Sequence, residues 1–358
     1  MGETMKAMVL TGHGGLDKYV WRDDWPKPEP GPMEVLIRVG ACGLNNTDVN
    51  TRTGWYSKAV SEATTGGAYD SVGEDDPTWG GAPITFPRIQ GADVVGEVTA
   101  VGEGADPALI GQRVMTNGWL RDWSDPDNMD KTGYFGSECD GGFAEFTTID
   151  ARNIAVVSSD LSDAELATFS CSYTTAEGML TRAGVTDADT VLVPGASGGV
   201  GGALVQLAKR RGARVIAMAS EAKHEEVKAL GPDMILPRAP GDLRAALGGE
   251  KVSVVADIVG GPYWPKLIDI LERGGRYTCS GAIAGPMVTF DLRTFYLRDL
   301  TFTGSTVIAP EVFENVVRYI EQGAIRPVLA ATYPLSELRA AQQAFIDKKH
   351  TGNIVVSP

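Results

Sequence analysis

The sequence predicts an α/β protein of two domains, one built on a doubly wound parallel sheet and the other rich in β-strands. Three observations support this prediction. The chain has 358 residues, of which 43% are hydrophobic and 44 are glycine, and this length suits two cores better than one. Short strand-like runs separated by glycine and proline fill the first half. From about residue 162, helix-like and strand-like runs alternate.

The first half predicts the β-rich domain. Alternation of apolar and polar residues marks strands at residues 6–10, 34–39, 93–101 and 111–115. Four prolines between the first two runs cannot donate to a backbone ladder, so they predict a turn-rich connection; they are Pro26, Pro28, Pro30 and Pro32. Residues 57–87 are rich in glycine and acids without a clear period, which is typical of an inserted loop and equally of a disordered segment.

The second half predicts the parallel sheet. Its strand-like runs are residues 190–193, 214–219, 252–257 and 275–279, and helices are expected between them, including residues 199–211 and 223–230. Apolar runs of this length are typical of strands covered on both faces by helices. A helix near residues 311–321 and a strand at residues 353–356 follow, and this last strand is expected to rejoin the first domain. The domains are therefore predicted as residues 1–160 with 310–358, and residues 161–309.

Charge and composition restrict the partners. The net charge of −14 repels phosphate backbones and anionic lipid, so we expect neither nucleic acid nor a membrane as a partner, and the charge could equally be only a solubility feature. The expected partner is a small-molecule substrate. The four cysteines form no Cys-x-x-Cys pair, which fits a reducing compartment. No signal-peptide pattern and no apolar run of about 20 residues is present. A cytoplasmic protein is expected.

The strongest local motif is the glycine-rich segment from Val193 to Gly202. It follows a predicted strand and begins a predicted helix, which is the setting in which backbone N–H groups and a helix N-terminus bind a pyrophosphate. The segment predicts a dinucleotide site whose binding residues are Ser197, Gly198, Gly199 and Val200. No Lys-Ser or Lys-Thr pair follows the glycines, which disfavours a P-loop nucleotidase.

The end of the next strand predicts which dinucleotide binds. A site for NAD usually has an acid there, but this chain has Ser220, followed three residues on by Lys223. A hydroxyl and a cation suit the 2′-phosphate of NADPH. Glu221 could instead repel that phosphate or accept from a ribose hydroxyl, so NADH remains an alternative. Gly281, just beyond a later strand, is a further cofactor-binding candidate.

The chain resembles the medium-chain dehydrogenase/reductase superfamily, and within it the zinc-independent quinone oxidoreductase branch. The residues that carry the resemblance are residues 43–48 with Arg52, Gly54 and Tyr56, residues 91–98, residues 141–146, Thr175-Ala176 and the glycine loop. The resemblance implies a Rossmann domain and a partly open, GroES-like β-barrel catalytic domain closed by the C-terminal segment. It also implies an active site in the cleft between these domains.

The same resemblance argues against zinc. Zinc-containing alcohol dehydrogenases carry Cys-His where this chain has Asn45-Asn46, and His-Glu where it has Ala92-Asp93. Only Cys171 keeps a thiol at a usual ligand position. A catalytic zinc needs about three converging ligands, so no metal site is predicted.

Without a metal to polarise a carbonyl, the expected reaction is hydride transfer to a quinone or an α,β-unsaturated carbonyl or enoyl compound. The resemblance places Asn45 near the nicotinamide ribose and Thr175 near the nicotinamide or its phosphate. Candidate hydrogen-bond donors to the substrate are Asn50, Tyr56 and Tyr173. Asp48 and Arg52 lie four residues apart and are expected to form a structural ion pair.

Other interpretations remain open. Residues 57–87 and the aromatic-rich residues 119–134 exceed what a minimal quinone reductase needs, and the second stretch resembles a loop of crotonyl-CoA reductase/carboxylase relatives. An alcohol dehydrogenase acting on an alcohol/aldehyde pair is one alternative, and a non-catalytic NADPH-binding protein is another. A homodimer is expected, because dimers are common in the family and among soluble oligomers.

Overall fold

The structure is a computed structural model that describes residues 2–69, 72–73, 76 and 83–358. The chain folds as two compact units. The strand-rich unit comprises Met1–Val60, Thr65–Cys171 and Phe313–Pro358, and the nucleotide unit comprises Ser61–Thr64 and Ser172–Val312. Part of the insert expected at residues 57–87 lies outside the described residues.

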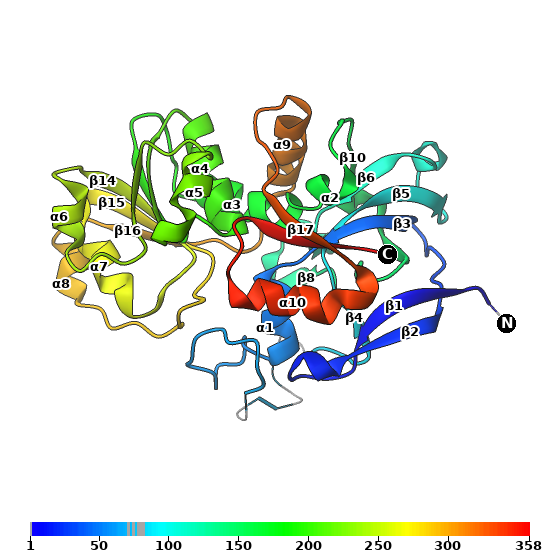
Figure 1. Ribbon diagram of the computed structural model, residues 1–358. Coiled ribbons are helices and arrows are strands. Elements are labelled where there is room, and N and C mark those ends of the chain that lie inside the picture. The colour runs from blue at the N-terminus through cyan, green and yellow to red at the C-terminus, as the bar shows by residue number, and fades with distance from the viewer. Residues whose placement is uncertain (1, 70–71, 74–75, 77–82) are drawn as a thin grey trace. The chain divides into compact units, whose positions relative to one another are not determined.

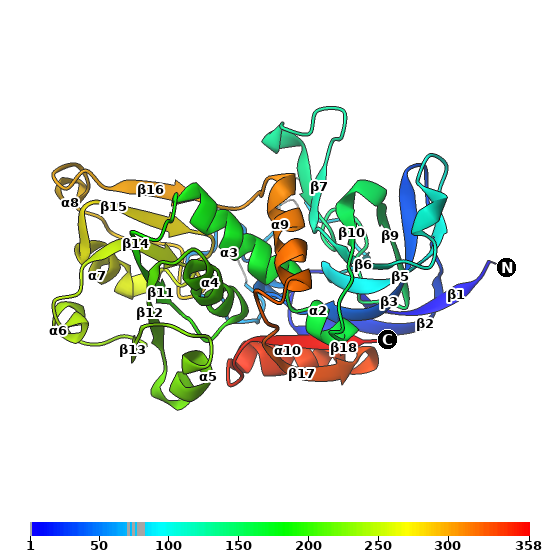
Figure 2. The ribbon, with the colours of Figure 1, turned by 90° about the horizontal axis from the view of Figure 1, so that it is seen from above.

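The nucleotide unit is built on a parallel sheet with the strand order β13-β12-β11-β14-β15-β16; Figure 1 labels β14, β15 and β16, and Figure 2 labels all six strands. In that order the strands are Met234–Pro237, Arg214–Ala219, Thr190–Pro194, Val252–Asp257, Leu271–Cys279 and Thr301–Gly304. Its helices are α3 (Ser170–Arg182), α4 (Gly199–Arg210), α5 (His224–Lys228), α6 (Leu243–Leu247), α7 (Trp264–Asp269) and α8 (Leu292–Tyr296). The predicted doubly wound parallel sheet is confirmed.

The apolar runs become central strands because both faces of this sheet are covered. On one face a cluster includes Leu192, Ile216 and Val255, all fully buried, together with Trp264. The ring of Trp264 meets that of Tyr277 edge to face at 5.7 Å. Helix α4 packs against β11 and β12 (Figure 2). This packing fixes the carboxyl ends of the parallel strands at one edge, where the loops that bind ligands in such sheets begin.

The strand-rich unit has a main sheet with the order β10-β6-β5-β3-β18-β17, and β9 also pairs with β3. Its strands are β3 (Glu34–Gly43), β5 (Asp93–Val101), β6 (Arg113–Thr116), β9 (Phe146–Asp150), β10 (Ile154–Val156), β17 (Leu329–Pro334) and β18 (Asn353–Ser357). Smaller sheets join β1 (Thr4–Leu10), β2 (Tyr19–Pro26) and β4 (Arg88–Ile89), and β7 (Trp119–Arg121) with β8 (Thr132–Tyr134). The helices are α1 (Asn46–Thr53), α2 (Asp163–Leu166), α9 (Pro310–Glu321) and α10 (Leu338–Asp347). The predicted GroES-like, strand-rich domain is confirmed.

The last strand closes this unit, as predicted from its sequence. β18 pairs antiparallel with β3, with Val355 opposite Gly43 and Val356 opposite Cys42, and it pairs parallel with β17 on its other side. Val355 and Val356 are buried. The end of the chain therefore supplies an interior strand of the sheet (Figure 1).

The expected ion pair between Asp48 and Arg52 is wrong. The Asp48 carboxylate instead accepts a hydrogen bond from the Asn45 backbone N–H at 2.8 Å, at the start of α1. Arg52 is fully buried and donates to the backbone carbonyl oxygens of Gly14 and Gly66 and to the side chain of Gln342. Its guanidinium thus ties the N-terminal segment, α1 and α10 together.

Within the part of the chain that the structure describes, no helix is both long enough and apolar enough to cross a bilayer.

Candidate active site

The glycine loop joins β11 to α4 through a tight turn. β11 ends at Pro194 and α4 begins at Gly199, with Gly198 as its N-cap. Gly195 has a φ of +68°, a backbone conformation that favours glycine, and its carbonyl accepts a hydrogen bond from the Gly198 N–H at 3.1 Å. The turn brings the N-terminus of a 12-residue helix directly to the end of a central strand.

Two glycines of this loop differ in what surrounds them. A Cβ atom at Gly201 would lie 2.1 Å from the Gly195 carbonyl oxygen, so the helix could not pack on its own loop with any side chain there. A Cβ at Gly198 would meet nothing closer than 3.6 Å. The first N–H groups of α4 have no intrahelical acceptor, and Gly198 offers no capping side chain. Backbone N–H groups without an intrahelical acceptor, at a helix N-terminus capped by glycine, fit the pyrophosphate of a dinucleotide.

The other predicted cofactor residues lie at the same edge of the sheet or close to it in sequence. Because β11, β12 and β15 are parallel, the glycine loop, Ser220 and Gly281 all follow carboxyl ends at one edge. The Lys223 N–H donates to the Ser220 carbonyl oxygen at 2.9 Å, one short turn beyond β12. Thr175 is half-buried on α3. The structure thus groups the loop, Ser220, Lys223 and Gly281 as one candidate nucleotide site.

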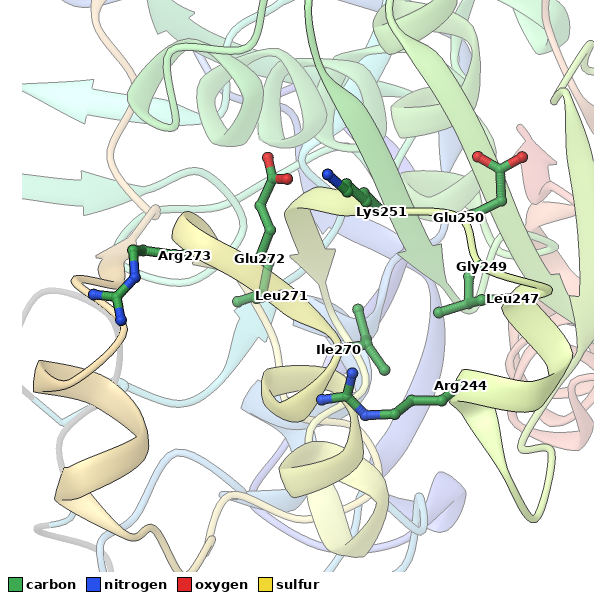
Figure 3. Close-up of a pocket in the computed structure, with 9 residues that line it drawn as sticks. All are labelled: Arg244, Leu247, Gly249, Glu250, Lys251, Ile270, Leu271, Glu272 and Arg273. Atoms are coloured by element: carbon green, nitrogen blue, oxygen red, sulfur yellow. The ribbon is translucent and has the colours of Figure 1, made fainter.

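A surface pocket of about 490 Å³ in the same unit lies at the opposite edge of the sheet (Figure 3). It surrounds the amino ends of β14 and β15, where Val252 pairs with Leu271. Two of its charged side chains are engaged within the fold: Arg244 donates to the Asp269 carbonyl oxygen, and Glu250 pairs with Arg214. This pocket is therefore separate from the candidate nucleotide site.

In the strand-rich unit, Asn45 belongs to a buried polar cluster. Its Nδ2 donates to Oδ2 of Asp93 at 3.0 Å, and the backbone N–H of Cys171 donates to Oδ1 of the same carboxyl at 3.0 Å. The pairing of Gly43 with Asp93 in the main sheet brings these segments together. A Cβ at Gly43 would lie 2.3 Å from the Ala167 carbonyl oxygen, so the close approach requires glycine.

Burial sets the protonation of the two carboxyls beside Asn45. The pKa of Asp93 is raised to about 7: burial is the largest cause, the hydrogen bond from Asn45 opposes it, and the nearby Asp48 charge adds to it. Burial also raises the pKa of Asp48 to about 7, although the Asn45 backbone N–H opposes the shift. Near neutral pH, the cluster therefore exchanges protons in a range where an exposed carboxyl would be fully ionised.

These raised pKa values predict the pH dependence of stability. Between about pH 4 and pH 7 the folded Asp93 keeps its proton while the unfolded side chain loses it, so the free energy of unfolding falls as pH rises through this window and levels off above it. We expect Asp93→Asn to reduce that slope, because a 3-unit pKa shift corresponds to a total change of roughly 4 kcal/mol in the free energy of unfolding across the window. Melting temperatures between about pH 4 and pH 8.5 measure it. The exposed Asp160→Asn should leave the slope unchanged; an unchanged slope in Asp93→Asn would contradict the assignment.

Tyr134 is a member of this cluster that the sequence did not single out. Its ring packs edge to face on Trp119 at 5.0 Å, and its hydroxyl shares a side-chain hydrogen bond with Cys171. Burial raises the pKa of Tyr134, so the hydroxyl stays protonated. A Cβ built at Gly118 would lie 3.2 Å from the Tyr134 Cζ and 3.3 Å from the Ala92 Cβ. The phenol therefore lies close to the alanine that stands at a ligand position of the zinc enzymes.

In the structure Asn50 and Tyr56 contact each other, whereas Tyr173 contacts a different helix. Asn50 Nδ2 donates to the Tyr56 hydroxyl at 3.4 Å, and burial raises the pKa of Tyr56. Tyr173 is buried in the nucleotide unit, where its hydroxyl accepts from Gln206 Nε2 of α4 at 2.7 Å. Asn50 and Tyr56 thus form one donor pair, whereas Tyr173 links α3 to α4.

Among the described residues, no group of three or more His, Cys, Asp or Glu side chains is arranged to hold a metal ion. Two of the histidines bond to backbone oxygens instead: His13 Nδ1 lies 3.0 Å from the Thr51 carbonyl oxygen, and His224 Nε2 lies 3.2 Å from that of Ala219.

Both units are similar to families of known proteins. Residues 31–159 match the alcohol dehydrogenase GroES-like domain family, and residues 199–322 match the family described as zinc-binding dehydrogenase. A solved structure from Sinorhizobium meliloti 1021, provisionally assigned as an alcohol dehydrogenase, is 46% identical, with a TM-score of 0.90 over 100% of this chain and 98% of that one.

Curated relatives are also similar over most of the chain. Acryloyl-coenzyme A reductase of Metallosphaera sedula is 28% identical over 99% of this chain and 100% of its own length. The chloroplastic NADPH-dependent alkenal/one oxidoreductase of Arabidopsis thaliana is 27% identical over 99% and 80%. With both units matched and the glycine loop in place, the chain belongs to the medium-chain dehydrogenase/reductase superfamily, in its quinone oxidoreductase-like branch.

Proposed function

We propose that this NAD(P)H-dependent oxidoreductase uses NADPH to reduce the conjugated C=C bond of an α,β-unsaturated carbonyl or enoyl compound, or a quinone, without a catalytic zinc. The observation that supports it best is the cluster around Asp93. There the carboxyl accepts hydrogen bonds from the Asn45 amide and the Cys171 backbone, and Ala92 offers no ligand atom. The relatives named as acryloyl-coenzyme A and alkenal/one reductases favour the same substrate class.

The chemistry of such a reduction suits neutral hydrogen-bond donors. Bound NADPH supplies a hydride for the β-carbon of the substrate. As the C=C electron pair moves toward the carbonyl, negative charge develops on its oxygen, and a proton must then reach the α-carbon. Tyr56, which keeps its proton because burial raises its pKa, is the proposed donor to that oxygen, and Asn50 orients its hydroxyl.

The residues at the carboxyl edge of the parallel sheet would hold the cofactor. The N-terminus of α4 faces the pyrophosphate in this proposal, and Ser220 and Lys223 face the 2′-phosphate. Asn45 near the nicotinamide ribose and Thr175 near the nicotinamide complete the proposed set, together with Ser197, Gly199, Val200 and Gly281.

Oxidation of NADPH and NADH against a panel of acceptors tests this proposal. We expect turnover of quinones, enones or enoyl-CoA esters with NADPH, unchanged by a chelator, and no stoichiometric zinc by elemental analysis. Activity restricted to aldehydes and lost on chelation would establish the alternative, a zinc alcohol dehydrogenase. Cofactor binding without turnover of any acceptor would establish a non-catalytic NADPH-binding protein.

A variant pair tests the proposed donor. Tyr56→Phe should lower kcat about 100-fold, as expected for the loss of one donor to a developing oxyanion. Tyr333→Phe removes a hydroxyl from a half-buried tyrosine on β17 and should leave kcat unchanged. An active Tyr56→Phe enzyme would exclude Tyr56 from this role.

We also propose a homodimer formed through the nucleotide unit. β16 is the last strand of its sheet, and terminal strands tend to be covered. Exposed apolar side chains precede it along the chain; they are Met287, Val288, Leu292, Tyr296 and Leu297. Sedimentation should give a dimer for the natural chain and a monomer for Leu292→Asp combined with Tyr296→Asp. A natural chain that sediments as a monomer would refute the proposal.

A further inference from the structure

Two cations and a hydroxyl lie at the carboxyl ends of the neighbouring strands β12 and β13. The strands are parallel, and Ala219 pairs with Pro237. The next residues, Ser220 and Arg238, therefore leave the sheet side by side, at about the 4.8 Å spacing of adjacent strands. Lys223 follows Ser220 within one hydrogen-bonded turn. Residues 18 positions apart in sequence are thus brought to one corner of the nucleotide unit.

The charges of Lys223 and Arg238 act on each other. Burial lowers the pKa of Lys223, and the positive charge of Arg238 lowers it further, against the opposing effect of Glu226. Two cations this close disfavour each other unless an anion shares them. Nearby cations of the same unit are paired, as Lys209 is with Asp233.

Arg238 has no such pairing. Its side chain is exposed, and no carboxylate among the described residues forms an ion pair with it. A guanidinium presents paired donors in a plane that matches the oxygens of a phosphate, whereas an ammonium acts as a point charge. Arg238 is therefore suited to a phosphate monoester held between itself and Lys223.

We propose that Arg238 is a specificity-determining residue that binds the 2′-phosphate of NADPH, opposite Lys223 and Ser220. This inference rests on the proposed use of NADPH and adds the residue that would make the preference strong. Arg238 should contribute nothing to the binding of NADH, because NADH has a hydroxyl in place of that phosphate.

The test measures binding rather than turnover. Energy transfer from the protein's tryptophans to the reduced nicotinamide gives the Kd for NADPH and NADH without any acceptor. We expect Arg238→Gln to raise the Kd for NADPH about 10-fold or more, the range for one charge-assisted hydrogen-bonding group, and to leave the Kd for NADH unchanged. Lys228→Gln makes the same change in net charge at an exposed position on α5 and should affect neither cofactor.

The outcomes separate this inference from the function on which it rests. A natural chain that binds NADH as tightly as NADPH would refute the NADPH preference itself. If Lys223→Gln weakens the binding of NADPH while Arg238→Gln does not, the preference for NADPH stands and the proposed role of Arg238 is wrong. If Arg238→Gln weakens the binding of NADPH and NADH equally, Arg238 contacts the cofactor away from the 2′-phosphate, and the inference is also overturned.

Discussion

Replacing Arg52 with methionine is expected to lower the free energy of unfolding of the strand-rich unit by about 3–5 kcal/mol, the cost of breaking a buried charged network. The side chain is fully buried and serves three acceptors: the carbonyl oxygens of Gly14 and Gly66, the latter at 3.1 Å, and Gln342 Oε1 at 3.2 Å. Methionine fills much of the volume but leaves all three acceptors without a donor. Denaturant unfolding followed by tryptophan fluorescence measures the loss.

An exposed arginine provides the control. Arg38 pairs with Glu97 at 3.1 Å, but the two side chains are 58% and 48% exposed. Arg38→Met should therefore change stability by less than about 1 kcal/mol. If both variants lose the same small amount, the buried guanidinium does not hold the N-terminal segment, α1 and α10 together.

The second large effect is expected from a pair of glycine variants in the cofactor loop. In Gly201→Ala the new methyl group would lie 2.1 Å from the Gly195 carbonyl oxygen, so the loop must move away from α4. We expect a lower melting temperature and at least a tenfold weaker Kd for NADPH, a change of about 1.4 kcal/mol in binding. Differential scanning fluorimetry and cofactor fluorescence measure the two quantities on the same samples.

Gly198→Ala separates folding from binding. Gly198 has a φ of −82° and a ψ of 171°, which alanine adopts readily, and its added methyl group would lie 3.6 Å from its nearest neighbour. Its melting temperature should match the natural chain, while NADPH binding weakens as in Gly201→Ala. Undiminished binding by Gly198→Ala would mean that the space beside this glycine is not used by the cofactor.

The parallel sheet was predictable because strands buried on both faces leave continuous apolar runs. Residues 214–219 and 252–257 coincide with β12 and β14, and the predicted helix at residues 199–211 corresponds to α4. β15 begins at Leu271, four residues before its prediction. The pair Gly274-Gly275 resembles a turn in sequence, but the strand absorbs it where the pairing shifts register.

Other features left little local signal. β2 is exposed along most of its length and so lacks alternation, which is why it was not predicted. Asp48 and Arg52 have the spacing of a helical ion pair, but distant backbone carbonyls compete for the guanidinium. Tyr134 and Arg238 act through neighbours that the fold alone brings close. The sequence did contain one sign of Arg238: it is a basic residue that directly follows β13, the strand that pairs with the one before Ser220.

The late position of β18 in the chain determines the order in which the two units can finish folding during synthesis on the ribosome. The nucleotide unit is almost wholly one continuous stretch, Ser172–Val312, and can fold once that stretch has emerged. The strand-rich unit begins earlier in the chain but lacks an interior strand until Asn353–Ser357 is made. During synthesis, Cys42 and Gly43 at the end of β3 therefore lack their β18 partner, and a chaperone or a neighbouring nascent chain can bind there. The domain encoded first is the one finished last.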